Sequence, residues 1–267
     1  MTHKQRFTST GVGKSLFMCH VASSVISEGK NVLYITLEMA EERIAERIDA
    51  NLLDVTIDDL YEMPKEIYDN KTSKMQNKTN GQLIIKEYPT ASAHAGHFKS
   101  LLDELALKKA FKPDLIFIDY LNICTSSRFK GGNINSYTMV KSIAEELRGL
   151  AVQYNVPIVS ATQTTRTGYL SSDVGLEDTS ESFGLPATAD FMFALMSNEE
   201  LEQLGQMKVK QLKNRYNDPS VNRAFIIGVD RAKMRLYDVQ QSSQNIVDSG
   251  QVEEKEEADN KLSDFKL

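Results

Sequence analysis

The sequence of 267 residues has no tryptophan, two cysteines and no long hydrophobic run. The cysteines, Cys19 and Cys124, are too few for a disulfide framework, so we expect a reduced, cytosolic setting. The longest apolar stretches, such as 191–196, fall far short of the roughly 20 residues that a membrane-spanning helix needs. The first ten residues are polar and lack the apolar core of a signal peptide. These absences argue against a membrane protein and against a secreted one.

The formal net charge is −6, but the charge is distributed unevenly. Residues 240–267 carry seven acids and three bases, and their Ser, Gln, Glu, Asp and Asn content predicts an acidic disordered tail. Residues 206–235 carry eight bases and two acids. A local basic surface is what phosphate contacts require, so the mild overall acidity does not exclude a nucleic-acid partner. A solvated strand face accounts for the same run, and charge pattern alone favours that simpler interpretation.

Helical periodicity alternates with short apolar runs as far as Asp190. We expect helices over 14–29, 40–53, 95–110 and 138–155, and strands over 31–37, 82–86, 114–119 and 156–161. Strands that alternate with crossover helices predict an α/β fold with a mostly parallel sheet. After Asp190 we expect only strands, as an antiparallel extension of the same sheet, over 191–196, 207–212, 223–229 and 235–239.

A phosphate-binding pattern opens the first expected helix, with the residues Gly11, Val12, Gly13, Lys14 and Ser15. In the P-loop pattern, backbone N–H groups at a helix N-terminus cradle phosphate, the lysine reaches the outer phosphates, and the hydroxyl binds Mg²⁺. Thr8 stands where the first glycine of the pattern falls, and no apolar strand precedes it. A chance Gly-Lys-Ser at a helix start therefore remains an alternative.

Three polar residues lie at or just after the ends of expected strands, and they strengthen the hypothesis that the chain binds a nucleotide. Asp119 ends the apolar strand 114–119, Glu38 follows the strand 31–37, and Gln163 follows the strand 156–161. A P-loop ATPase needs a carboxylate for the Mg²⁺ shell and a group that orients or deprotonates water. Each residue has a plainer explanation, since Asp is frequent where a strand turns and Glu favours a helix N-terminus. Their combination beside Gly-Lys-Ser predicts an ATP site.

The order of these motifs resembles the DnaB-type replicative DNA helicases, a family with a RecA-like P-loop NTPase core. The resemblance covers about 11–239 and is carried by Gly-Lys-Ser, by 34–39 (YITLEM), by 118–121 (IDYL) and by 160–163 (SATQ). The segments 38–42, 47–51, 135–137 and 184–191 are most similar to the phage members of the family. We therefore expect a RecA-like motor domain over 11–239, followed by the tail at 240–267.

The resemblance implies a role for each matching residue. The cofactors would be ATP and Mg²⁺, held by the Gly11–Ser15 segment, with Ser15 and Asp119 on the metal. Glu38 would be the catalytic base, and Gln163 would sense the γ-phosphate. Lys213 and Arg215 match a K-x-R pattern that reaches the neighbouring subunit's site. Two loops, 125–137 and 166–182, would grip single-stranded DNA through Arg128, Lys130 and Arg166.

The resemblance also implies partners and a context. It implies single-stranded DNA, a homo-hexamer that is weak in this chain, a primase and a helicase loader, in the cytoplasm of a phage-infected bacterial cell. Members of the family carry an N-terminal domain and a linker helix before the motor. We therefore expect residues 1–10 to be a truncated or non-native lead-in.

Two function classes stay open at this point. The first is an ATP-driven helicase motor that moves on single-stranded DNA. The second is a catalytically inert RecA-like module that binds nucleotide, DNA or a partner without turnover, and Thr8 favours it. A RecA-type recombinase is a third possibility within the ATPase class. ATPase activity with and without single-stranded DNA separates the active classes from the inert one.

Overall fold

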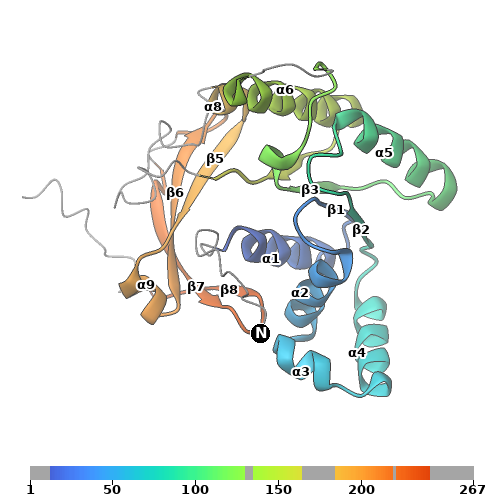
Figure 1. Cartoon of the computed structure of the whole chain (residues 1–267). Helices are drawn as coiled ribbons and strands as arrows, with labels where there is room; N and C mark the ends of the chain where they lie inside the picture. Colours follow the sequence, from blue (N-terminus) through green and yellow to red (C-terminus); the bar gives the residue numbers. More distant parts are fainter. Residues whose placement is uncertain (1–12, 130–134, 164–183, 219–220, 241–267) are drawn as a thin grey trace, which may run out of the picture.

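The computed structural model describes residues 13–129, 135–163, 184–218 and 221–240. In these residues two four-stranded sheets lie on either side of helix α1 (Lys14–Ser27), as Figure 1 shows. This arrangement places the start of α1 near the middle of the molecule.

The first sheet is wholly parallel, with the strand order β2-β1-β3-β4. All five residues of β1 are buried, and the continuous apolar run is typical of a parallel strand covered on both faces. The register sets Thr36 beside Asp119, so β1 and β3 end at the same edge. The four strands are β1 (Val32–Thr36), β2 (Leu83–Glu87), β3 (Leu115–Asp119) and β4 (Ile158–Ser160).

The predicted helices are confirmed to within three residues at each end, and Figure 1 shows them around the parallel sheet. They are α1, α2 (Glu41–Leu53), α5 (Ala95–Lys109) and α6 (Ser136–Tyr154), and a short 3-10 helix, η1 (Leu121–Ile123), follows β3. No helix among the described residues is long and apolar enough to cross a bilayer.

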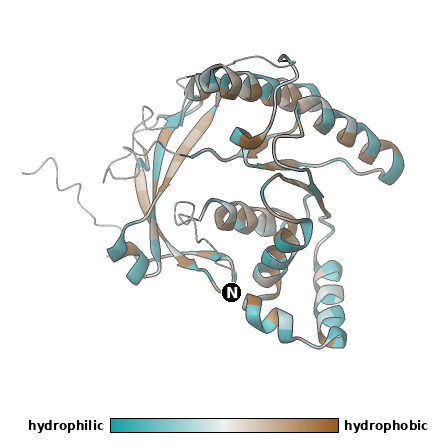
Figure 2. Ribbon diagram, viewed as in Figure 1, coloured by the Kyte–Doolittle hydropathy of each residue, from teal (hydrophilic) through white to brown (hydrophobic). Residues whose placement is uncertain are grey.

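Two further helices follow α2, in a region for which no helix was predicted. They are α3 (Ile57–Glu62) and α4 (Lys65–Lys78), and neither buries a residue. Figure 2 shows α4 as mostly hydrophilic. A helix that is polar on all sides gives no hydrophobic period, so its sequence offers no amphipathic signal.

The second sheet is antiparallel, with the order β5-β6-β7-β8, and it confirms the four strands predicted after Asp190. These strands are β5 (Phe191–Met196), β6 (Gln206–Asn214), β7 (Ala224–Asp230) and β8 (Arg235–Asp238). The prediction that helices cease here was wrong, because α9 (Glu199–Gln203) joins β5 to β6. Asn198 caps α9 by accepting a 2.8 Å hydrogen bond from the Leu201 N–H. Another short helix, α8 (Gly184–Thr188), precedes β5.

The antiparallel strands form a sheet of their own, which corrects the expectation that they extend the parallel one. No ladder joins β4 to β5 in the part of the chain that the structure describes. Helix α1 lies between the sheets and packs on both (Figure 1). Its Met18 packs in the cluster under the parallel sheet, whereas its Leu16 packs with Met207 and Leu236 of the antiparallel sheet. The helix therefore links the two sheets through a separate apolar cluster on each side.

Candidate nucleotide-binding site

The site is built around the N-terminus of α1. Gly13 precedes the helix with φ 103° and ψ 22°, a left-handed conformation that favours glycine. The first helical hydrogen bond runs from the Phe17 N–H to the Gly13 carbonyl oxygen at 2.8 Å. The N–H groups of the first turn have no intrahelical acceptor, Gly13 offers no capping side chain, and the turn holds no acid. This end of the helix is therefore suited to an anion.

Lys14 lies within the electrostatic reach of two carboxylates. Partial burial lowers the pKa of Lys14, while the charges of Glu38 and Asp119 act in the opposite direction and favour the ammonium form. Its Nζ atom is 5.7 Å from the centre of the Tyr120 ring. The structure thus brings Lys14, Glu38 and Asp119 within electrostatic reach of one another.

Glu38 is placed by a tight bend after β1. The Thr36 hydroxyl donates to the Met39 carbonyl oxygen at 2.8 Å and accepts from the Met39 N–H at 3.1 Å. The Leu37 N–H donates to the Asp119 carbonyl oxygen at 2.9 Å, which ties the bend to the end of β3. Glu38 is exposed at the tip of this bend, so its carboxylate is accessible to water.

Asp119 is 1% exposed, and its two carboxylate oxygens have different surroundings. The Tyr34 hydroxyl donates to Oδ2 at 2.9 Å. Burial raises the pKa of Tyr34 well above its ordinary value, so the hydroxyl keeps its proton. Oδ1 is buried and has no hydrogen-bond partner among the described residues. A buried carboxylate oxygen without a hydrogen-bond partner destabilises the folded state unless a ligand binds to it.

The available donor set fits a hard cation held together with a phosphate. Asp119 supplies a carboxylate oxygen, and Ser15, at the start of α1, supplies a hydroxyl. The described residues contain no group of three or more His, Cys, Asp or Glu side chains that could hold a metal. Mg²⁺ is commonly bound through one or two carboxylates plus substrate phosphates, so this sparse set suits it only with a nucleotide present.

Gln163 is linked to the site through Tyr120, a residue for which no role was predicted. Its Nε2 donates to the Tyr120 hydroxyl at 3.1 Å. The pKa of Tyr120 is raised by burial first, and then by the charges of Glu38 and Asp119. Tyr34 was missed in the same way. A tyrosine in an otherwise apolar strand was the available signal, because a buried phenol needs a hydrogen-bond partner.

Arg215 and Lys213 lie at the end of β6, beside α8. Arg215 donates to Asp190 Oδ1 at 2.8 Å and to the Ala187 carbonyl oxygen at 3.0 Å. Lys213 donates to the Pro186 carbonyl oxygen at 2.5 Å. Arg148 of α6 donates a hydrogen bond to Asp190 Oδ2 at 2.7 Å. This bond is the main reason that the pKa of Asp190 is lowered.

The Arg215 side chain stays 40% exposed despite these bonds. The hydrogen bonds and the ion pair described for Arg215 go to Asp190 and Ala187 of the same chain, and none of them reaches Lys14, Glu38 or Asp119. Arg215 is therefore partly accessible to solvent, although Asp190 and the Ala187 carbonyl oxygen hold its guanidinium.

Arg128 is the one predicted DNA contact that the structure describes. Its guanidinium pairs with Glu145 and lies 3.8 Å from Glu146, both on α6. The predicted residues Gly11, Val12, Lys130 and Arg166 lie outside the described part of the chain.

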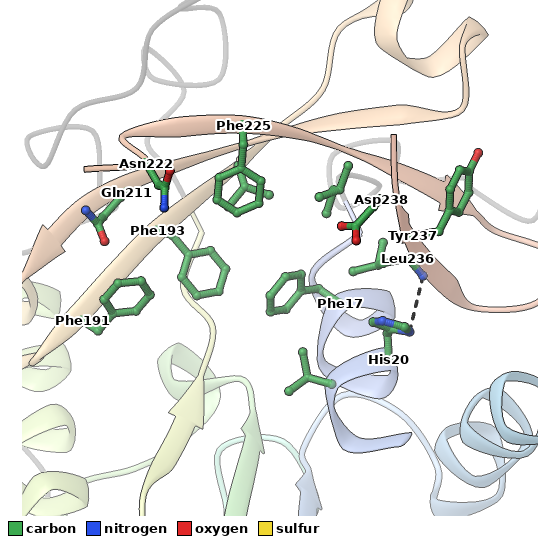
Figure 3. A pocket seen from close by; sticks show the side chains of 13 residues that line it. Phe17, His20, Phe191, Phe193, Gln211, Asn222, Phe225, Leu236, Tyr237 and Asp238 are labelled. Atoms are coloured by element: carbon green, nitrogen blue, oxygen red, sulfur yellow. Dashed lines mark hydrogen bonds between the residues drawn. The ribbon is translucent and has the colours of Figure 1, made fainter. Parts of the chain in front are cut away.

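A cavity of about 500 Å³ lies between α1 and the antiparallel sheet. Figure 3 shows Phe17 and His20 of α1 facing Phe193 and Phe225 across it. None of the residues of the nucleotide-binding site lines this cavity. Its walls are mainly aromatic and aliphatic, so it is not suited to a phosphate.

Comparison with known proteins gives a consistent result. The sequence model for the DnaB-like helicase C terminal domain matches residues 8–232. The DnaB-like replicative helicase of Enterobacteria phage T4 is 47% identical over 235 residues, which cover 87% of this chain and 50% of that protein. The replicative DNA helicase DnaB of Helicobacter pylori is 23% identical over 189 residues, which cover 69% of this chain and 37% of that protein.

Solved structures share the fold. A DnaB-like replicative helicase, described with its interactions with primase, superposes with a TM-score of 0.69 at 16% identity, covering 86% of this chain and 56% of that one. A solved ATPase domain superposes with the same TM-score at 17% identity, and the alignment covers 86% of this chain and 82% of that one. The chain spans about half the length of the phage T4 relative. On the extent of the domain match and the identity to that relative, the chain belongs to the DnaB-like helicase C-terminal domain family.

Proposed function

We propose that this chain is the motor portion of an ATP-dependent DNA helicase. The observation that carries the proposal is the meeting of Lys14, Glu38 and Asp119 where α1 begins and β1 and β3 end. Open α/β sheets bind their ligands at the carboxyl ends of the strands. A cation, a buried carboxylate and an exposed carboxylate at that edge are the groups that ATP hydrolysis requires.

Each residue then has a chemical task. The free N–H groups of α1 and the Lys14 ammonium would bind the ATP phosphates. Asp119 and Ser15 would hold Mg²⁺, which, when bound, offsets the charge of the phosphate oxygens. Glu38 would accept the proton of the water that attacks the γ-phosphate. Gln163 would sense the γ-phosphate from the end of β4, with its amide oriented by the Tyr120 hydroxyl.

The second part of the proposal concerns assembly. Arg215 would stabilise the transition state in a neighbouring subunit of a hexamer, with Lys213 as its companion. The exposure of Arg215 and its distance in sequence from Lys14 support this assignment. Arg128, Lys130 and Arg166 would bind the phosphates of single-stranded DNA. The solved helicase described with primase makes a primase a natural partner to test, and a helicase loader is proposed from the family resemblance alone.

The competing function is a RecA-like module that binds without turnover. Thr8, at the position of the first P-loop glycine, is the observation that favours it. Such a module would bind nucleotide weakly or not at all, and single-stranded DNA would not stimulate hydrolysis.

Two pairs of variants test the proposal. Lys14→Ala should abolish ATP binding, whereas Lys30→Ala, which removes an exposed lysine after the same helix, should not. Glu38→Gln should keep ATP binding and lower hydrolysis at least 100-fold, in line with the loss of a general base. Glu28→Gln, at the exposed C-cap of α1, is its control. Equal binding by Lys14→Ala and the unmodified chain would contradict the proposed site.

A further inference from the structure

Tyr34 lies at the centre of β1 and is completely buried. Its ring stacks on Phe117 of β3, with centroids 5.5 Å apart and an interplanar angle of 22°. The two residues are register partners in the parallel ladder. Every other position of β1 except Thr36 is aliphatic, so a phenylalanine would satisfy the packing. The hydroxyl therefore needs an explanation of its own.

That hydroxyl meets the carboxylate at the end of β3. It donates to Asp119 Oδ2 at 2.9 Å, across a separation of 85 residues in the sequence. The other oxygen, Oδ1, is buried without a hydrogen-bond partner among the described residues. One hydrogen bond to one oxygen fixes the rotation of the carboxylate and leaves the second oxygen uncommitted.

The Asp119 carboxylate can be placed relative to the N-terminus of α1, where phosphate is proposed to bind. The charge of Asp119 acts on Lys14, so the carboxylate lies near the start of that helix. A carboxylate that ligates a cation needs a partner to orient it, and such partners tune metal affinity strongly. Among the described residues, Tyr34 is the side chain that donates a hydrogen bond to the Asp119 carboxylate.

We propose that Tyr34 is a positioning residue that holds the Asp119 carboxylate so that Oδ1 faces a divalent cation bound together with nucleotide. The inference rests on the proposed function, because it needs a cation–nucleotide complex at this edge of the sheet. It adds a residue of β1 to a site otherwise formed by residues at strand ends and at the start of α1.

The test measures Mn²⁺ affinity by electron paramagnetic resonance in the presence of ADP, with the full chain. Tyr34→Phe keeps the ring and removes only the hydroxyl. It should raise the Mn²⁺ dissociation constant about tenfold or more. The affinity for ADP without a divalent cation should change less than twofold, a separation that general loss of structure would not produce.

Two control variants separate the hydrogen bond from packing. Tyr68→Phe removes a similar tyrosine–aspartate bond, from Tyr68 to Asp49 Oδ2 at 2.7 Å, and should leave Mn²⁺ affinity unchanged. Phe117→Leu removes the stacked ring and keeps the Tyr34 hydroxyl, so it should bind Mn²⁺ like the unmodified chain. Even if Tyr34→Phe does not fold, tenfold weaker Mn²⁺ binding in Phe117→Leu would assign the effect to packing and contradict the positioning role.

The possible failures are distinct. If Tyr34→Phe binds Mn²⁺ as tightly as the unmodified chain while Asp119→Asn does not, the positioning role is wrong and the proposed site stands. If Phe117→Leu weakens Mn²⁺ binding tenfold, packing is responsible and the positioning role is again wrong. If the unmodified chain binds no Mn²⁺ with ADP, the proposed function is contradicted and the inference fails with it.

Discussion

Arg128 shows how a residue predicted to bind DNA can be engaged within its own chain. Its guanidinium pairs with Glu145 and lies close to Glu146. Exposed ion pairs are weak and are screened by salt, so a DNA phosphate can replace them. The pair would then act as a competitor that DNA must displace.

This competition gives the first prediction. Glu145→Gln should tighten single-stranded DNA binding, because Arg128 loses its competing carboxylate. Arg128→Gln should weaken binding and reduce the slope of log affinity against log salt by about 0.7, the value for one phosphate contact on a single strand. Fluorescence anisotropy at several salt concentrations measures both effects. An unchanged slope in Arg128→Gln would remove Arg128 from the DNA contacts.

His20 gives a second prediction, about pH. Burial lowers the pKa of His20 in the folded chain, and Arg235 lowers it further. The unfolded chain therefore takes up this proton at a higher pH, near 6.5, than the folded chain does. Above about pH 6.5, His20 is neutral in both states and does not change the free energy of unfolding. As the pH drops from about 6.5 to the pKa that His20 has in the folded chain, the free energy of unfolding falls.

His20→Gln should accordingly make stability less dependent on pH. Urea unfolding at pH 7.5 and 5.5 measures the difference, with His97→Gln on α5 as the control. A pH dependence that is the same in His20→Gln and in the unmodified chain would show that His20 does not titrate between the folded and unfolded states as expected.

The chemistry of single residues was predictable to different degrees. Lys14, Glu38 and Asp119 could be proposed as site residues because phosphate and metal chemistry restricts the residue types at such positions. Tyr34 and Tyr120 could not, because their hydroxyl partners are set by the register of β1 with β3 and by the return of the chain at β4.

At the scale of elements, the start of α1 depends on one glycine. A Cβ atom on Gly13 would lie 3.0 Å from Met207 Cε, and φ of 103° disfavours any other residue. Gly13→Ala should therefore destabilise the chain by about 1–2 kcal/mol, the cost of a left-handed conformation for an L-residue. Its loss should also weaken nucleotide binding.

Gly149 provides the matched control. It is exposed in the interior of α6, and a Cβ there would meet no atom within 4 Å. Gly149→Ala should stabilise the chain by about 0.5–1 kcal/mol, because alanine favours the helix. Chemical denaturation of both variants measures the pair. Destabilisation of equal size at both positions would contradict the conformational argument for Gly13.

Elements with a clear hydrophobic period were predictable, and elements without one were not. The helices α5 and α6 bury one face each, which sets a readable spacing. The helices α3 and α4 bury no residue, and α8 and α9 have only five residues each. Their helical state depends on caps and tertiary contacts, such as the Asn198 cap of α9.

At the scale of the whole molecule, the separation of the two sheets could not be predicted from strand patterns. Alternating and continuous apolar runs predict strands, but they do not say which edges pair. Helix α1 packs in a separate apolar cluster on each side, through Met18 on one side and Leu16 on the other, and so links the two sheets.

Assembly gives a further prediction. In rings assembled on single-stranded DNA, Glu38→Gln should lower hydrolysis at least 100-fold, and Arg215→Ala should lower it about 10³-fold or more. Mixed rings should recover activity, because some interfaces then pair an intact Glu38 with an intact Arg215. Mixtures that co-assemble but never exceed the sum of the separate activities would show that Arg215 does not act across an interface.

The most direct test of the motor assignment is steady-state ATP hydrolysis by the full chain, with and without single-stranded DNA. If the chain is a helicase motor, single-stranded DNA should increase the rate several-fold, and Lys14→Ala should abolish hydrolysis under both conditions. The motor assignment would be contradicted if hydrolysis persists in Lys14→Ala. It would also be contradicted if the chain folds and binds nucleotide but hydrolyses no ATP with or without DNA.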